Sequence, residues 1–88
     1  MKIIVVGCGG RENLIIHKLI EKNDVFCIGS WVNYDIYQML PQERYFKAEL
    51  KPLTCIPICH NINPDLIIVG GETLLATDFV ETCNSNGW

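Results

Sequence analysis

The chain has 88 residues, of which 49% are hydrophobic and 19% charged, so it can form one small domain with a buried core. Its formal net charge is −3 and it carries no cluster of lysine or arginine, which argues against binding to nucleic acid. The longest apolar run near the start, Ile3 to Val6, is too short for a secretory signal or a membrane span. We therefore expect a cytoplasmic protein that does not bind a membrane.

The first three predicted elements are a strand, a helix and a second strand. Lys2 to Gly7, KIIVVG, is an apolar, β-branched run that predicts a strand buried on both faces, as in a parallel sheet. Arg11 to Lys22 predicts a helix, because its apolar residues recur at helical spacing. Its apolar face comprises Ile15, Ile16, Leu19 and Ile20. Val25 to Ile28 predicts the second strand, which Gly29 and Ser30 end.

The middle of the chain, residues 31–62, has a weaker pattern. Its three prolines, Pro41, Pro52 and Pro57, are expected to interrupt any long helix. Short helices are expected near Tyr34 to Met39 and near Thr54 to His60.

The last third of the chain repeats the strand-then-helix order. Leu66 to Val69, LIIV, predicts a third buried strand, which Gly70 and Gly71 end. A helix is expected next, with Gly87 at its C-terminal end. Its apolar positions are Leu75, Ala76, Phe79, Val80 and Cys83. Strands that alternate with helices predict an α/β fold with a parallel sheet and right-handed crossovers.

The five cysteines form an odd-numbered set without regular spacing, so we expect reduced thiols that are buried or half-buried. Cys55, Cys59 and His60 come close together in the sequence and invite comparison with a zinc site. Their spacing is CxxxC rather than CxxC, Pro57 lies inside it and no second pair follows. No metal is therefore expected in this chain.

Three glycines lie between the first strand and the first helix. Gly7, Gly9 and Gly10 let the backbone approach a ligand, and the helix that follows offers free N–H groups and the positive end of its dipole. Phosphate is the usual occupant of such a turn, although a tight turn without a ligand has the same glycines. A dinucleotide is disfavoured, because Glu12 replaces the third glycine of GxGxxG and no acidic residue ends the second strand. A P-loop is excluded, because no Gly-Lys-Ser/Thr follows.

Two stretches resemble the phosphoribosylamine–glycine ligase (glycinamide ribonucleotide synthetase) family. VVGCGGRENLIIHKL is similar to the family's opening, in which a G-x-G-G-R-E-H-A motif follows the first strand. PDLIIVGGETLLATDFVETCNSNGW is similar to its next signature, D-L-x-V-x-G-P-E-x-P-L. The resemblance implies a single N-terminal domain over residues 1–88, with the small Rossmann-like fold that precedes an ATP-grasp domain. The ATP-grasp domain itself is absent from these residues.

The resemblance also implies a substrate site. The residues that match the phosphate-holding loop, expected to bind the 5-phosphate of phosphoribosylamine, are Gly7, Gly9, Gly10, Arg11 and Glu12. Glu72 matches the glutamate of the second signature, whose carboxylate is suited to ribose hydroxyls or the amine. Glu72 fits equally well as a first-turn charge that complements a helix dipole.

This sequence departs from the family at three places. Asn13 replaces the histidine of the first motif, Gly71 replaces the proline before the glutamate, and residues 29–33 replace an expected P-G-N stretch. The chain also stops at Trp88, before the expected last strand and the ATP-binding machinery. ATP and Mg²⁺ are implied for the full-length enzyme only, so we expect no cofactor and no ligation by this chain alone.

Two other functions stay open at this point. One is a non-catalytic module that binds a phosphosugar or a nucleotide. The other is an interaction domain. The predicted strand order places Leu66 to Val69 at an open sheet edge, which is expected to pair with a partner protein or a second copy.

Overall fold

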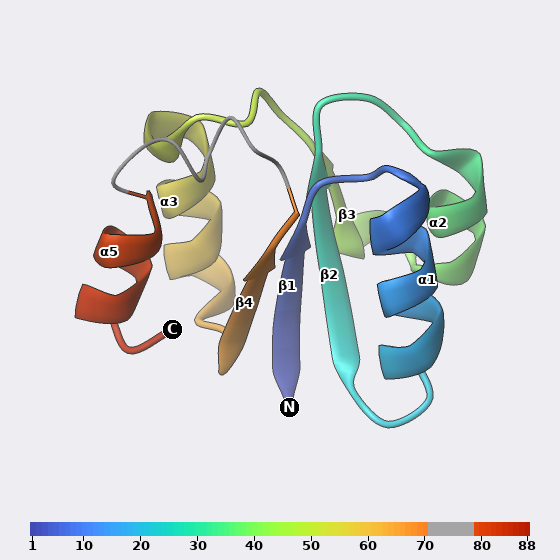
Figure 1. Ribbon diagram of the computed structural model, residues 1–88, viewed down its shortest axis with the longest axis horizontal. Coiled ribbons are helices and arrows are strands. Elements are labelled where there is room, and N and C mark those ends of the chain that lie inside the picture. The colour runs from blue at the N-terminus through green and yellow to red at the C-terminus, as the bar shows by residue number, and fades with distance from the viewer. Residues whose placement is uncertain (71–78) are drawn as a thin grey trace.

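The computed structural model describes residues 1–70 and 79–88, which form a parallel sheet between two layers of helices (Figure 1). The elements are β1 (Lys2–Val6), α1 (Gly10–Leu19), β2 (Asp24–Gly29), α2 (Tyr34–Met39), the 3₁₀ turn η1 (Gln42–Arg44), β3 (Tyr45–Lys47), α3 (Pro52–Ile62), β4 (Leu66–Val69) and α5 (Phe79–Ser85). The sheet order is β3-β2-β1-β4, and every neighbouring pair is parallel. The α/β class and the parallel sheet flanked by helices are confirmed.

The sheet contains one strand that the sequence did not predict. The order β2-β1-β4 agrees with the prediction, and β4 pairs with β1 alone among the described strands. The additional strand β3 lies beyond β2, with Tyr45 opposite Cys27 and Phe46 opposite Ile28. It has only three residues, so its apolar pattern is too short to distinguish from a loop.

Successive side chains of β1 point to opposite faces of the sheet and enter two separate cores. Ile3 and Val5 pack on the face covered by α1 and α2, and Ile4 and Val6 pack on the face covered by α3 and α5 (Figure 1). All four residues are buried, as expected for a central strand of a parallel sheet. On the first face, Ile16 of α1 is fully buried, and Ile15, Leu19 and Ile20 pack around it.

The third helix corrects the prediction that proline would interrupt a long helix in the middle of the chain. α3 begins at Pro52, a position that tolerates proline because its N–H would have no helical partner. Pro57 lies inside the helix and, having no N–H, removes the usual helical donor to the carbonyl of Leu53, four residues earlier. Leu53 is 89% exposed and Pro57 also faces solvent, so water can reach this turn of the helix.

The first and last helices have well-defined C-terminal ends. α1 ends three residues before the prediction, and the carbonyl of its last residue, Leu19, accepts from the backbone N–H of Asn23 and from its side-chain amide at 3.0 Å. After α5, Gly87 adopts a left-handed φ of 80°. The N–H of Gly87 bonds to Asn84 and that of Trp88 to Cys83, which is a Schellman motif. The predicted C-terminal glycine is therefore confirmed, whereas Val80, predicted on the apolar face, is 38% exposed.

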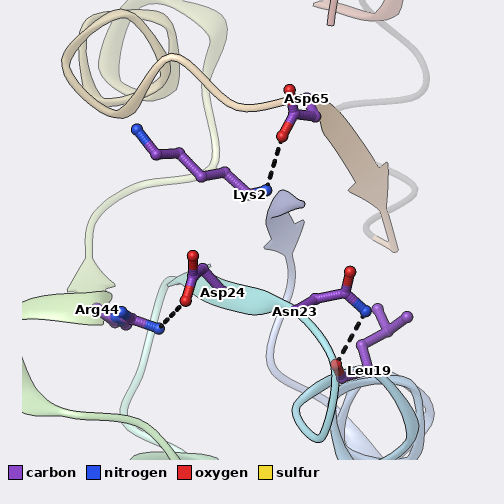
Figure 2. Close-up of polar contacts among 6 residues, drawn as sticks. All are labelled: Lys2, Leu19, Asn23, Asp24, Arg44 and Asp65. Atoms are coloured by element: carbon purple, nitrogen blue, oxygen red, sulfur yellow. Dashed lines mark hydrogen bonds and ion pairs between the residues drawn. The ribbon is translucent and has the colours of Figure 1, made fainter.

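Polar contacts join the elements at the amino-terminal ends of the strands (Figure 2). The backbone N–H of Lys2 donates to the Asp65 carboxylate at 2.8 Å, which fixes the start of β1 beside the start of β4. Arg44 contacts Asp24 at 3.4 Å, which joins η1 to β2. The hydrogen bond from the Asn23 side-chain amide to the Leu19 carbonyl lies at the same end of the sheet. No helix within residues 1–70 and 79–88 is both long and apolar enough to cross a membrane.

Candidate functional site

The candidate site is at the carboxyl end of the sheet, where the chain reverses its direction of winding. From β1 the chain winds through β2 to β3 on one side, and it returns to place β4 on the other side of β1. In open parallel sheets the crevice outside such a reversal is the usual ligand site. Here the turn after β1 and Gly70 after β4 lie side by side at that switch point, at the upper end of the sheet in Figure 1.

The turn from β1 into α1 has the conformation of an anion-binding loop. Gly7 has a φ of 119°, which a residue with a side chain rarely adopts, and its N–H bonds to Ile28 at 2.8 Å. Gly9 is the N-cap residue of α1 and has no side chain with which to cap the helix. The first N–H groups of α1 therefore have no acceptor within the helix or from its N-cap side chain, which is the arrangement that attracts an anion.

Glu12 lies inside the site and is 7% exposed. Its carboxylate lies against the Cα atoms of Gly7 and Gly70, so that a methyl group added at Gly70 would come within 2.5 Å of Oε1. Both positions therefore need to be glycine for Glu12 to fit between β1 and β4. Among the described residues, Glu12 is the one buried charged side chain, which places a carboxylate between the ends of β1 and β4.

Arg11 reaches from the first turn of α1 to the residue that follows β4. Its Nη2 donates to the carbonyl of Gly70 at 3.3 Å, and the side chain is exposed. A guanidinium has five N–H donors, so this one bond leaves the group able to contact an anion. Arg11 and Glu12 are consecutive residues and present opposite charges at the outside and the inside of the site.

A buried polar network lies behind the glycine loop. The side-chain amide of Asn33 donates to the carbonyl of Cys8 at 2.6 Å, and the Cys27 thiol donates to the carbonyl of Gly7 at 3.3 Å. Burial, reinforced by Cys8 and Glu12, raises the pKa of the Cys27 thiol to about 12, so it keeps its proton at neutral pH. The Tyr45 hydroxyl accepts from the backbone N–H of Asn33 at 3.0 Å and donates to the carbonyl of Trp31 at 2.6 Å. Burial also raises the pKa of Tyr45.

The structure brings five of the six residues named from the sequence to one end of the sheet. These residues are Gly7, Gly9, Gly10, Arg11 and Glu12. The sixth, Glu72, lies outside the described residues. The sequence did not single out Asn33 or Tyr45 as site residues. An asparagine just before a predicted helix is an N-cap signal, but nothing in the sequence connects it with Cys8.

The cysteine and histidine run that resembled a metal site is divided between two faces of α3. Cys55 and Cys59 are buried in the core, whereas His60 is exposed. The His60 ring packs edge-on against Trp88, with 4.9 Å between the two ring centroids. All five cysteines are buried as free thiols. Within the part of the chain that the structure describes, no three metal-binding side chains come together.

Comparison with known proteins identifies the family. The family model "Phosphoribosylglycinamide synthetase, N domain" matches residues 1–88. The phosphoribosylamine–glycine ligase of Methanobrevibacter smithii is 29% identical over 87 residues, which cover 99% of this chain and 20% of that enzyme. The chain thus spans about a fifth of the length of this relative. No solved structure matches. The chain belongs to the phosphoribosylglycinamide synthetase N-domain family.

Proposed function

We propose that residues 1–88 form one domain that binds the phosphate of phosphoribosylamine for a phosphoribosylamine–glycine ligase of de novo purine synthesis. The observation that carries this proposal is the uncapped N-terminus of α1, which follows a glycine loop at the switch point of the sheet. Membership of the family and the position of Arg11 beside that loop support it further. The same loop would also serve a non-catalytic phosphosugar-binding module, which is the alternative.

In this proposal the two charged residues of the loop hold different parts of the ligand. A phosphate is attracted by the N–H groups of the first turn of α1 and by the Arg11 guanidinium. It is repelled by the Glu12 carboxylate, which is buried between Gly7 and Gly70. The phosphate therefore lies on the outer side of the loop. Glu12 faces the ribose hydroxyls or the amine, which donate hydrogen bonds to a carboxylate.

We further propose that ligation requires the rest of the enzyme. Activation of the glycine carboxylate by ATP calls for Mg²⁺ and for positive groups around the nucleotide phosphates. In the proposal these belong to the part of the ligase that this chain does not span. We expect the purified chain to form no glycinamide ribonucleotide from ATP, Mg²⁺, glycine and phosphoribosylamine. Turnover that persists after removal of contaminating ligase would overturn the assignment of catalysis to the remainder of the enzyme.

An NMR titration tests the binding proposal. We expect ribose 5-phosphate to perturb the amide signals of Gly9, Gly10 and Arg11, and we expect NADH to perturb them much less. Gly9→Val should abolish the response. The Cβ atom itself makes only an ordinary 3.6 Å contact with Glu12, so the branched methyl groups would mainly occupy the space of the anion. His17→Ala, at an exposed position in the last turn of the same helix, is the matched control and should bind normally. Equal responses to both ligands, or no response to either, would refute the proposal.

We also propose that the outer edge of β4 pairs with another chain. Among the described strands β4 has one neighbour, β1, and Leu66 on β4 is 40% exposed. A strand edge without a partner exposes N–H and C=O groups that recruit a further strand. An interaction role through this edge is compatible with the phosphate site, which lies at the end of the sheet.

A further inference from the structure

Asn33 makes more polar contacts than its position in an ordinary connecting loop requires. Its Oδ1 caps α2 by accepting from the N–H groups of Asp35 and Ile36, at 3.0 and 3.4 Å. Its backbone N–H donates to the hydroxyl of Tyr45, and its Nδ2 donates to the carbonyl of Cys8 at 2.6 Å. One side chain therefore fixes the start of α2 and holds the glycine loop after β1.

We propose that Asn33 is a positioning residue that sets the direction of the N–H groups with which the glycine loop binds phosphate. This inference rests on the proposed function, because it assigns Asn33 a role in that same site. The experiment below separates the failure of one from the failure of the other.

The rigidity of the peptide unit connects Asn33 to the ligand. A peptide bond is planar and trans, so its C=O and N–H point in opposite directions. The carbonyl of Cys8 belongs to the same peptide plane as the N–H of Gly9. Because Asn33 holds that carbonyl, the Gly9 N–H must point the opposite way. The Cys27 thiol holds the carbonyl of Gly7 in the same manner and thereby orients the N–H of Cys8.

The glycine loop needs this external support because its sequence provides little rigidity of its own. Glycine restricts the backbone less than any other residue, so Gly7, Gly9 and Gly10 leave several loop conformations accessible. Binding would then cost the entropy of selecting one conformation, unless the free protein already holds it. The bonds from Asn33 and Cys27 orient two successive N–H groups before a ligand arrives, as in other backbone anion nests.

Tyr45 keeps Asn33 in place from the far side of the network. The Tyr45 hydroxyl accepts from the N–H of Asn33 and donates to the carbonyl of Trp31, and Tyr45 is only 8% exposed. The Tyr45 hydroxyl and the Cys8 side chain also pack closely against Gly29. A methyl group added at Gly29 would lie 2.9 Å from the Cys8 side chain and 3.0 Å from the Tyr45 hydroxyl. The hydroxyl that holds the Asn33 N–H and the residue whose carbonyl Asn33 binds therefore pack against the same glycine.

The test uses Asn33→Ser, which keeps an N-cap acceptor for α2 but is too short to reach Cys8. We expect the affinity for ribose 5-phosphate to fall about tenfold, which corresponds to the loss of one well-formed hydrogen bond. In the ligand-free protein the amide signals of Cys8 and Gly9 should shift, whereas those of Asp35 and Ile36 should stay close to their positions in the unmodified chain. A change in stability alone would not produce that pattern.

Asn23→Ser is the matched control. The Asn23 side chain also donates to a backbone carbonyl, that of Leu19, but it lies at the amino-terminal end of the sheet, opposite the site. It should lower stability and leave affinity unchanged. Equal affinity of Asn33→Ser and the unmodified chain, or loop amide signals that do not move, would overturn the positioning role.

If Asn33→Ser does not fold, Asn33→Asp carries the same test, since it keeps the cap and places a carboxylate oxygen against the Cys8 carbonyl. Absence of binding by the unmodified chain would refute the proposed function, while the loop amide signals would still decide the positioning role.

Discussion

The close fit of Glu12 between two glycines leads to a quantitative prediction for Gly70→Ala. The new methyl group would lie 2.5 Å from Oε1, 2.6 Å from Cδ and 2.8 Å from Cγ of Glu12, so the glutamate must move. It cannot retreat toward β1, because Gly7 has no space for it on that side. Overfilling of a packed site of this kind costs about 1–3 kcal/mol of unfolding free energy. For a domain of this size, each 1 kcal/mol lowers the melting temperature by about 4–8 °C.

Urea denaturation of four variants measures this effect and identifies its cause. Gly70→Ala should lose about 2 kcal/mol in the unmodified chain and clearly less in a Glu12→Ala background, with a coupling energy of about 1 kcal/mol. Gly10→Ala is the control. Apart from its own turn of helix, no atom of the described residues lies within 4 Å of its added methyl group, and alanine is the better helix residue, so stability should rise by about 0.5–1 kcal/mol. Additive effects of Gly70→Ala and Glu12→Ala would mean that the buried carboxylate is not what excludes a side chain at Gly70.

Three further predictions concern other parts of the fold. Burial raises the pKa of Cys27 and of Cys59 to about 12, compared with about 9 in the unfolded chain, so the folded state binds more protons between these values. The contribution of these two thiols to stability should therefore be constant below pH 9, and stability should fall between about pH 9 and 12, as measured by urea denaturation; a rise in that range would contradict the burial of these thiols. Gly87→Ala should lower the unfolding free energy by about 1 kcal/mol, because alanine is strained at a φ of 80°, and an unchanged melting temperature would exclude the C-cap role. Leu66→Lys should reduce self-association in sedimentation experiments, because a lysine on an edge strand opposes pairing, and a chain that is monomeric without the substitution would show that no second copy binds β4.

The regular elements could be predicted because each is long enough to show its period. β1 and β4 are uninterrupted apolar runs, and α1 presents its apolar residues at intervals of three and four. α2 was predicted with its observed limits, Tyr34 to Met39. β3 was missed because three residues are too few for a pattern. The extent of α3 was misjudged because Pro57 removes one helical bond without ending the helix. It lies on an exposed turn where water can reach the freed carbonyl, and exposure is a property of the tertiary structure.

The part of the site that lies within one stretch of sequence was visible in advance, and the part made by tertiary contacts was not. Gly7 to Glu12 are consecutive, so their spacing alone indicated an anion loop after a strand. The contact of Arg11 with Gly70 spans 59 positions, and that of Asn33 with Cys8 spans 25. Which face of α1 buries Glu12 also depends on β4, which is distant in the sequence. Such pairings follow from the strand order and have no local signature.

The central position of the first strand has a consequence for how the chain folds. β1 needs β4 as its neighbour, and the bond from Lys2 to Asp65 closes a separation of 63 positions. Contacts between residues so far apart form slowly, because the entropy of closing a long loop must be lost before the contact is gained. During synthesis the apolar residues of β1 are made well before those of β4 and remain without one of their two neighbouring strands until Leu66 to Val69 have been made. Of the strands in this sheet, β1 therefore waits longest for a native neighbour, and its apolar residues stay unprotected for that interval.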